Sequence, residues 1–339
     1  MSSRVLASTI NCPNTLNLKP TSQTKVPVSL YIEGALSVRQ TSSKDENEFF
    51  VAPEVELINS CSQSLTAKTF IAPLPERLNI FAHRSKESRS SAFINVSSVD
   101  QKMAMEKKGP SWHAYATSFS DLRFVGATVR LAHGLLTLDR EINSVQDLVG
   151  KRIGLVMRPS SLRVLQEALL ISVWDIYDQI IVKEYSPGEM SKALEQGEVD
   201  AIFLPVIRET KGKLLPINLD FNRRDLHWIS ISTKDVKNTI ENTLILADHM
   251  VLPEVTQLAN KEQDIGLITF DVAWFTFAST PDNVVYDFLQ AVRHICPPGI
   301  NSCSEISTDR LLLWPELETR LIHPGAQRFY KEQGAISYP

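Results

Sequence analysis

Apolar and polar positions alternate along the chain in two periods, one typical of strands and one typical of helices. In the first third, apolar runs of strand length occur at residues 26–32, 68–72, 92–96 and 122–128. Segments with helical apolar spacing lie between them, at residues 48–60, 76–84 and 99–106. Strands that alternate with helices at this spacing predict an α/β fold with parallel strands.

The middle of the chain repeats this alternation with clearer boundaries. Further strands are predicted at residues 152–157, 179–183 and 199–204. Gly150 closes a short helical turn before the first of them, and Pro159, Ser160 and Ser161 open a helix after it. Ser186 and Glu189 have the spacing of a capping box for the next helix.

The last helix is predicted at residues 324–333. Pro324 has a φ angle already suited to a helix start, and Gly334 suits the left-handed position beyond its end. Lys331 lies near the C-terminal end, where the helix dipole favours a positive charge.

Three segments carry a resemblance to a known family. Residues 321–334, with the string His323-Pro324-Gly325-Ala326, resemble the ending of the TAXI family, the solute-binding receptors of TRAP-type membrane transporters. Residues 144–157 and 186–203 resemble two blocks of periplasmic-type receptors. The three segments occur in the same order and at similar distances as in that family.

The resemblance implies a two-lobe type II periplasmic-binding-protein-like fold, with two α/β lobes joined by a hinge. Residues 26–136 and 269–339 would form the first lobe, and residues 137–268 the second, after a disordered tail at residues 1–25. Such lobes close over a ligand by hinge motion.

The candidate ligand-binding residues of the first lobe follow three of the predicted strands. In the family, a glycine-rich turn follows the first strand, and Glu33, Gly34 and Ser37 occupy that place here. Only Gly34 keeps the bare backbone that lets a ligand approach closely. Arg77 is a candidate carboxylate clamp, with an exposed, solvated arginine as the alternative. Ser97 and Ser98 follow a buried strand, where the family has a pocket-facing segment.

The candidates of the second lobe are Arg158, Ser160, Ser161 and Phe203. Two hydroxyls at a helix start are suited to an anion, although a serine there also serves as a simple cap. Phe203 matches the edge of the family's pocket, with core packing as its alternative role.

Composition narrows the choice of partners. The formal net charge of −4 argues against nucleic-acid binding, which usually needs a basic face.

The sequence contains no run of about 20 apolar residues, so it predicts no membrane-spanning helix. The first 25 residues lack the apolar segment of a signal peptide. The resemblance implies a periplasmic location, and a cytosolic one stays open. Cys296 and Cys303 are either free thiols or a small disulfide-closed loop.

We therefore expect a monomeric solute-binding protein that captures an amino acid or organic acid for a TRAP membrane permease. A diverged cytosolic sensor or protein-binding relative, with an altered or lost pocket, is the first alternative. An enzyme on the same fold is the second. No catalytic residue, metal site or cofactor is expected, because no reactive motif and no metal-ligand spacing occurs in the sequence.

Overall fold

The computed structural model describes most of the chain in several ranges. These are residues 25–32, 55, 58–59, 62–72, 74–186, 188–208, 214–216, 226–252, 265–292, 294–295, 304–305 and 321–334. The predicted tail, the four cysteines and the turn with Glu33, Gly34 and Ser37 lie outside these ranges, Lys25 excepted.

One large curled sheet organises the described residues. Its path consists of eight strands: β1 (Val26–Ile32), β2 (Leu65–Ile71), β3 (Ala92–Ser97), β4 (Leu122–Thr137), β5 (Arg152–Val156), β6 (Ile181–Tyr185), β7 (Ala201–Arg208) and β11 (Ile265–Phe277). Their order across the sheet is β2-β1-β3-β11-β4-β7-β5-β6. Three shorter strands join its side: β8 (Leu214–Pro216) pairs with β7, β9 (His227–Ile229) with β4 and β10 (Asp248–Leu252) with β11. A separate pair is formed by β12 (His294–Ile295) and β13 (Ser304–Glu305).

Helices cover the sheet at both ends. The α-helices are α2 (Leu74–Asn79), α3 (Lys86–Arg89), α4 (Gln101–Glu106), α5 (Ser161–Glu167), α6 (Met190–Glu195), α7 (Thr233–Asn242), α8 (Asp282–Val292) and α9 (Pro324–Glu332). Short 3-10 turns are η3 (Ser111–His113), η4 (Val145–Leu148) and η6 (Tyr177–Gln179), and α5 continues into a π-helical turn, η5 (Ala168–Val173).

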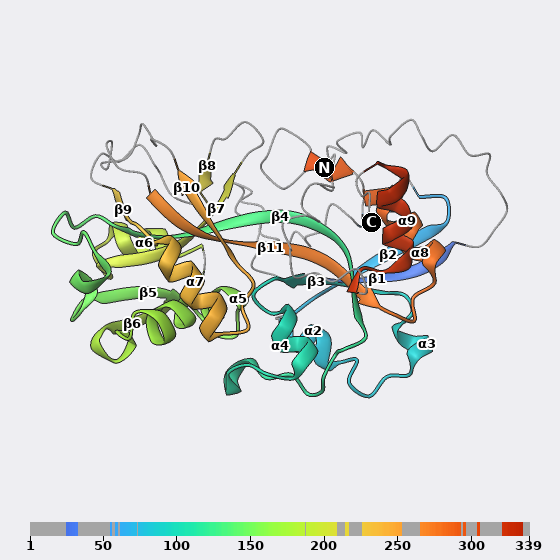
Figure 1. Cartoon of the computed structure of the whole chain (residues 1–339), viewed down its shortest axis with the longest axis horizontal. Helices are drawn as coiled ribbons and strands as arrows, with labels where there is room; N and C mark the ends of the chain where they lie inside the picture. The colour runs from blue at the N-terminus through green and yellow to red at the C-terminus, as the bar shows by residue number, and fades with distance from the viewer. Residues whose placement is uncertain are drawn as a thin grey trace, which may run out of the picture.

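The elements form two lobes joined by two long strands (Figure 1). We call β1–β3 with α2–α4, α8 and α9 the first lobe, and β5–β10 with α5–α7 the second lobe. Strands β4 and β11 run antiparallel between them: β11 pairs with β3 of the first lobe and β10 of the second, and β4 pairs with β7 and β9 of the second. The fold is therefore the expected α/β fold with two lobes. The boundaries predicted at residues 136–137 and 268–269 fall within β4 and β11, and they stay predictions.

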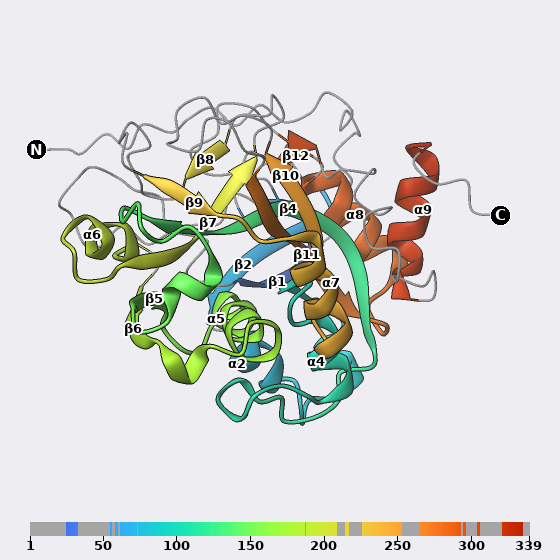
Figure 2. The ribbon, with the colours of Figure 1, turned by 60° about the vertical axis from the view of Figure 1, so that its left-hand side comes forward.

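The core runs through the crossing strands. All thirteen residues of β11 are buried, so this strand is covered on both faces, as expected of a central strand. Helices α4, α5 and α7 come together below the sheet, where the two lobes meet (Figure 2).

Most predicted elements among the described residues are confirmed, whereas only residues 55, 58 and 59 of the helix predicted at 48–60 are described. The predicted parallel pairing holds for β1 with β2 and β3 and for β5 with β6 and β7, but β4 and β11 pair antiparallel with their neighbours. Three elements differ from their predictions. The strand predicted at 122–128 extends to Thr137, because its second half pairs with β7, β9 and β11. The helix predicted at 76–84 ends at Asn79. The capping box predicted at Ser186 does not begin a helix: Ser186 Oγ donates to Glu189 Oε2 at 2.6 Å, but the helix begins only at Met190.

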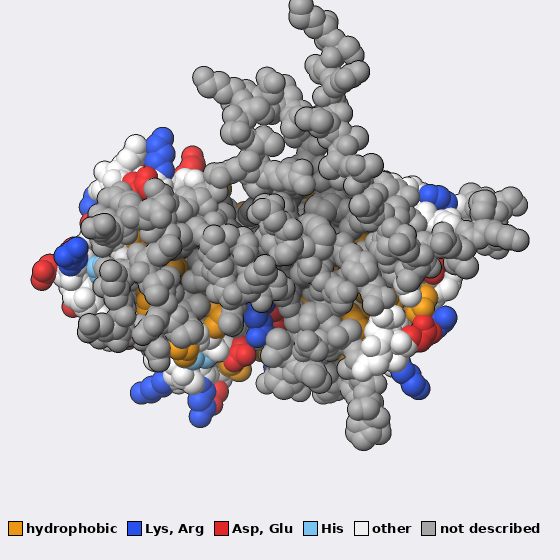
Figure 3. All heavy atoms as spheres, turned by 90° about the horizontal axis from the view of Figure 1, so that it is seen from above, with side chains coloured by type: hydrophobic (Ala, Val, Ile, Leu, Met, Phe, Trp, Pro, Cys, Tyr) orange, Lys and Arg blue, Asp and Glu red, His pale blue; other side chains and the backbone are white. Residues whose placement is uncertain are grey.

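The described surface carries charges of both signs. In the view from above, Lys and Arg side chains are interspersed with Asp and Glu side chains around the part that is described (Figure 3). Among the described residues, no helix has both the length and the apolar character needed to cross a membrane.

Candidate functional site

Ser97 and Ser98 lie where β3 ends, on the side of the first lobe that faces the second. Both are buried, with 5% and 3% of their surface exposed. Ser97 Oγ donates to Asp100 Oδ2 at 2.5 Å. Ser98 Oγ donates to the carbonyl oxygen of Leu246 at 2.7 Å and accepts from the backbone nitrogen of Asp271 at 3.1 Å. Ser98 therefore connects the end of β3 with the segment after α7 and with β11.

Asp100 is the centre of a buried polar cluster that sequence reasoning missed. Its Oδ1 lies 2.5 Å from His113 Nε2 and accepts from the Tyr115 hydroxyl at 3.1 Å. Asp100 and His113 are fully buried. Burial alone would raise the pKa of Asp100, but the charge and hydrogen bond of His113 and the hydroxyls of Ser161 and Ser97 outweigh it. They hold this pKa below its usual range, so the carboxylate is ionised.

The second lobe reaches this cluster through Ser161. Ser160 is the N-cap of α5, and its Oγ accepts from the backbone nitrogen of Leu162 at 3.2 Å. The hydroxyl of Ser161 faces the Asp100 carboxylate closely enough to lower its pKa, although it makes no well-aligned hydrogen bond in the structure. We call Ser97, Asp100, His113, Tyr115 and Ser161 the interlobe cluster.

Arg158 also reaches across the space between the lobes. Its guanidinium forms an ion pair with Glu167 of the second lobe. The same group lies over the ring of Trp112 in the first lobe, 4.7 Å from the ring centroid. Arg163, fully buried, donates to the same Glu167 oxygen, Oε1, at 2.9 Å, and the Tyr177 hydroxyl donates to it at 3.1 Å. The carboxylate of Glu167 is therefore buried and paired with two guanidinium groups.

Arg77 is buried, with 1% of its surface exposed, so the alternative of a solvated surface arginine is wrong. Its Nη1 donates to the backbone oxygen of Asn95 at 2.5 Å and to that of Tyr31 at 3.4 Å. These carbonyls belong to β3 and β1, so the cation lies near the ends of two parallel strands. Its role as a carboxylate clamp stays a prediction.

Phe203 is fully buried in an aromatic stack. Its ring is stacked on His133 at 5.5 Å between centroids and on Trp174 at 6.2 Å. This places it in the core of the second lobe beside α5. Ligand contact at Phe203, as at the serines and Arg158, stays a prediction. Glu33, Gly34 and Ser37 lie outside the described residues.

A cavity of about 240 Å³ opens between the lobes beside the interlobe cluster. Met103, Gly109 and Pro110 line it from the first lobe. Helix α5, the π-helical turn and residues 243–245 line it from the second lobe. Its lining is mainly apolar, and Glu167 is its one charged lining residue among those described. We call this cavity the outer pocket.

The cluster does not form a catalytic relay among the described residues. Ser97 and His113 both bind the Asp100 carboxylate, and no contact joins the Ser97 hydroxyl to the histidine ring. A serine nucleophile needs its hydroxyl within reach of a base. Within the same residues, no group of three or more His, Cys, Asp or Glu side chains is arranged to hold a metal ion.

Comparison with known proteins places this arrangement in a family. Residues 91–334 match the sequence profile of the NMT1-like family, which is well over half of the chain. The chain belongs to the NMT1-like family. The matched range begins just before β3 and ends after α9, so it includes every residue of the interlobe cluster and of the outer pocket.

Several solved structures resemble this NMT1-like chain at low identity. A periplasmic transporter is 10% identical over 91% of this chain and 93% of its own, with a TM-score of 0.43. An amino acid ABC transporter substrate-binding protein from Streptococcus pneumoniae, bound to L-arginine, is 14% identical over 92% and 97%, with a TM-score of 0.39. A TctC solute binding protein from Polaromonas is 10% identical over 93% and 100%, with a TM-score of 0.40.

Proposed function

We propose that this NMT1-like protein is a solute-binding protein that captures a small organic ligand between its lobes. The observation that carries the proposal is the meeting of polar side chains from both lobes at one carboxylate, beside a cavity. Ser97 and His113 bind Asp100 from the first lobe, and Ser161 faces it from the second. A ligand bound beside Asp100 and Ser161 would be held by both lobes at once, which favours closure.

The ligand class we propose is an amino acid or organic acid, delivered to a TRAP-type membrane permease. Support for the class comes from the resemblance to TAXI receptors and from Arg158, a cation whose guanidinium lies over Trp112 of the other lobe. Support for the TRAP permease comes from the C-terminal string at residues 323–326, which resembles that of TAXI receptors.

A diverged relative that senses another ligand or binds a protein is the second candidate. One observation favours it: the two lobes already contact each other through their own side chains. Arg158 lies over Trp112, and Ser98 is bonded to Leu246. A cleft held by such contacts binds a solute only if the solute replaces them.

Thermal unfolding against a panel of amino acids, dicarboxylates, keto acids and sugars tests the proposal. A ligand that binds only the folded state at a hundredfold excess over its dissociation constant adds about 2.7 kcal/mol to the free energy of unfolding. We expect one chemical class to raise the midpoint, and Ser161→Ala or Arg158→Gln to reduce that rise.

Ser186→Ala is the matched control, because Ser186 lies in the second lobe and its hydroxyl binds Glu189 rather than any residue of the cluster. This variant keeps the full rise in midpoint. A panel without any rise contradicts the proposal and favours the diverged relative.

A further inference from the structure

The outer pocket has the size of one chemical group rather than of a whole ligand. Its volume is about 240 Å³, whereas whole drug-sized ligands fill pockets of roughly 300–1,000 Å³. An apolar cavity of about 150 Å³ is enough for a benzene ring. The outer pocket therefore has room for a single ring or a short branched or linear carbon chain.

One face of the helix that begins at Ser161 contributes residues both to the interlobe cluster and to the outer pocket. Ser161, Val164, Ala168 and Ile171 follow one another at spacings of three and four residues, so they lie on one face of the helix. Ser161 faces Asp100, and the other three line the outer pocket. One face of a single helix thus runs from the polar cluster to the apolar pocket.

The far part of this face is the π-helical turn Ala168–Val173. Such turns are rare and frequently occur at functional sites. Ile171, on this turn, is a pocket residue with 49% of its surface exposed. The lining therefore includes apolar surface that the chain's own packing leaves in contact with solvent, and a bound apolar group would cover part of it.

Arg158, which pairs with the charged lining residue Glu167, is a hydrogen-bond donor for an acid beside the pocket. Glu167 lines the pocket, and Arg158, Arg163 and Tyr177 all donate to its Oε1. Arg158 is 39% exposed, and its bonds to Glu167 and Tyr177 are all made through Nη2. Its Nε and Nη1 have no acceptor in the described part of the chain, so they are available to a ligand carboxylate.

We propose that the outer pocket takes the apolar group of a small monocarboxylic acid whose carboxylate is bound by Arg158. This inference rests on the proposed function, because it names the ligand class for the same space between the lobes. It selects acids with a ring or a chain of several carbons. Sugars and short dicarboxylates are excluded, since they would place polar groups against Val164, Ala168 and Ile171.

Isothermal titration of the whole protein with named probes tests this inference. Hexanoate and phenylacetate carry both an apolar group and a carboxylate, hexanamide has the chain without the charge, and succinate has the charge without the chain. We expect hexanoate or phenylacetate to bind, hexanamide to bind at least about tenfold more weakly for lack of a charge-assisted hydrogen bond, and succinate to bind most weakly.

Two variants locate the apolar group. Ala168→Phe fills the pocket and is expected to weaken binding of hexanoate by at least about tenfold. Ile171→Ser is the substitute if Ala168→Phe does not fold. It removes an apolar side chain from the pocket, and we expect it to fold because Ile171 is already half exposed. Ile181→Ser is the control, because Ile181 has a similar exposure of 51% and lies on β6 outside the pocket.

Arg158→Gln locates the carboxylate. This variant is expected to bind hexanoate more weakly than the wild type and to bind hexanamide equally well. Two results would overturn the inference: no binding of hexanoate or phenylacetate, or equal binding by the protein and its Ala168→Phe and Ile171→Ser variants. If succinate or an amino acid binds in either case, the proposed function stands without this inference. If no solute binds, both are wrong.

Discussion

His133 lies fully buried on β4, with its ring stacked on Phe203 and its Nε2 accepting from the Gln166 amide at 3.2 Å. The side-chain oxygen of Gln166 accepts from the backbone nitrogen of Val156, so the side-chain nitrogen faces His133 and is the donor in that hydrogen bond. The neutral ring is therefore the form that fits. Burial lowers the pKa of His133 to about 3.

Acid is expected to destabilise the protein through this histidine. The folded-state pKa lies below the unfolded value of about 6.5, so the neutral ring contributes its full stability above pH 6.5. As the pH falls from 6.5 towards 3, this contribution is lost at up to about 1.4 kcal/mol per pH unit. Urea unfolding at several pH values between 7 and 4 measures the slope.

The non-titrating variant His133→Gln isolates the effect. Glutamine has a similar size and still offers an acceptor to Gln166, while it cannot gain a proton in this range. The difference in free energy of unfolding between wild type and variant is expected to shrink as the pH falls. A difference that stays constant with pH would contradict a neutral His133 in the folded state.

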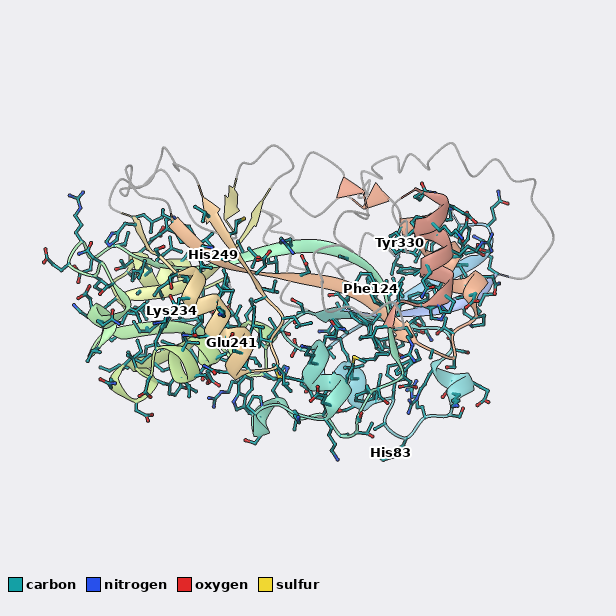
Figure 4. The ribbon with its side chains drawn as sticks, in the orientation of Figure 1. His83, Phe124, Lys234, Glu241, His249 and Tyr330 are labelled. Carbon is teal, nitrogen blue, oxygen red and sulfur yellow. The ribbon has the colours of Figure 1, made fainter. Side chains whose placement is uncertain are left out.

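At the scale of the element, the C-terminal helix follows from its sequence. His323 is the N-cap of α9: its Nδ1 accepts from the backbone nitrogen of Gly325 at 3.1 Å, and its Nε2 donates to the Thr280 carbonyl at 3.0 Å. Burial lowers the pKa of His323, which keeps the neutral ring that both bonds require. Tyr330, on the same helix, donates to the Val125 carbonyl of β4, close to Phe124 (Figure 4).

Gly325 is expected to tolerate no side chain. A Cβ at this position would lie 2.2 Å from the backbone oxygen of Asp282, at the start of α8, where the backbone cannot easily move. Gly325→Ala should therefore separate α9 from α8 and lower the free energy of unfolding by about 1–3 kcal/mol or more. Thermal and urea unfolding measure the loss.

Gly334→Ala is the control for that substitution. Gly334 has a φ of +70°, but nothing lies within 4 Å of an added Cβ, so only backbone strain of about 1–2 kcal/mol applies. Binding of any solute should be unchanged in both variants once they are folded, because α9 contributes no lining residue to the outer pocket. Equal, small losses in the two variants would show that the contact with Asp282 is not tight.

Local signals predicted the elements better than they predicted the site. The starts of α5 and α9 and the turn at Gly150 depend on neighbours in sequence, and each is confirmed. Ser97 and Ser161 were selected from the sequence as ligand-binding candidates, and that role stays a prediction. Their common partner Asp100 was missed, because only the fold brings His113 and Ser161 to it. The second half of β4 was missed for the same reason, since distant strands pair with it.

At the scale of the whole molecule, side chains hold the crossing strands β4 and β11 together, and a separate hydrogen bond between the two lobes must break when the lobes open. Arg130 on β4 and Asp271 on β11 face each other in register and form two hydrogen bonds, at 3.0 and 2.9 Å. The backbone nitrogen of Leu246, in the second lobe, donates to the Ser98 carbonyl of the first lobe at 3.1 Å. Exchange of the Leu246 amide hydrogen therefore reports separation of the lobes.

Ser98→Ala is expected to speed that exchange. The substitution removes two hydrogen bonds of Ser98 Oγ, the one to the Leu246 carbonyl and the one from the backbone nitrogen of Asp271, a cost of about 1–3 kcal/mol. Hydrogen exchange measured by NMR should therefore rise by about tenfold or more at Leu246. Ser97→Ala is the control, because that hydroxyl binds Asp100 inside the first lobe. Unchanged exchange at Leu246 in Ser98→Ala would mean that Ser98 does not hold the lobes together. A bound solute that closes the lobes should slow the exchange in wild type and variant alike, since closure protects the amide whichever hydroxyl is present.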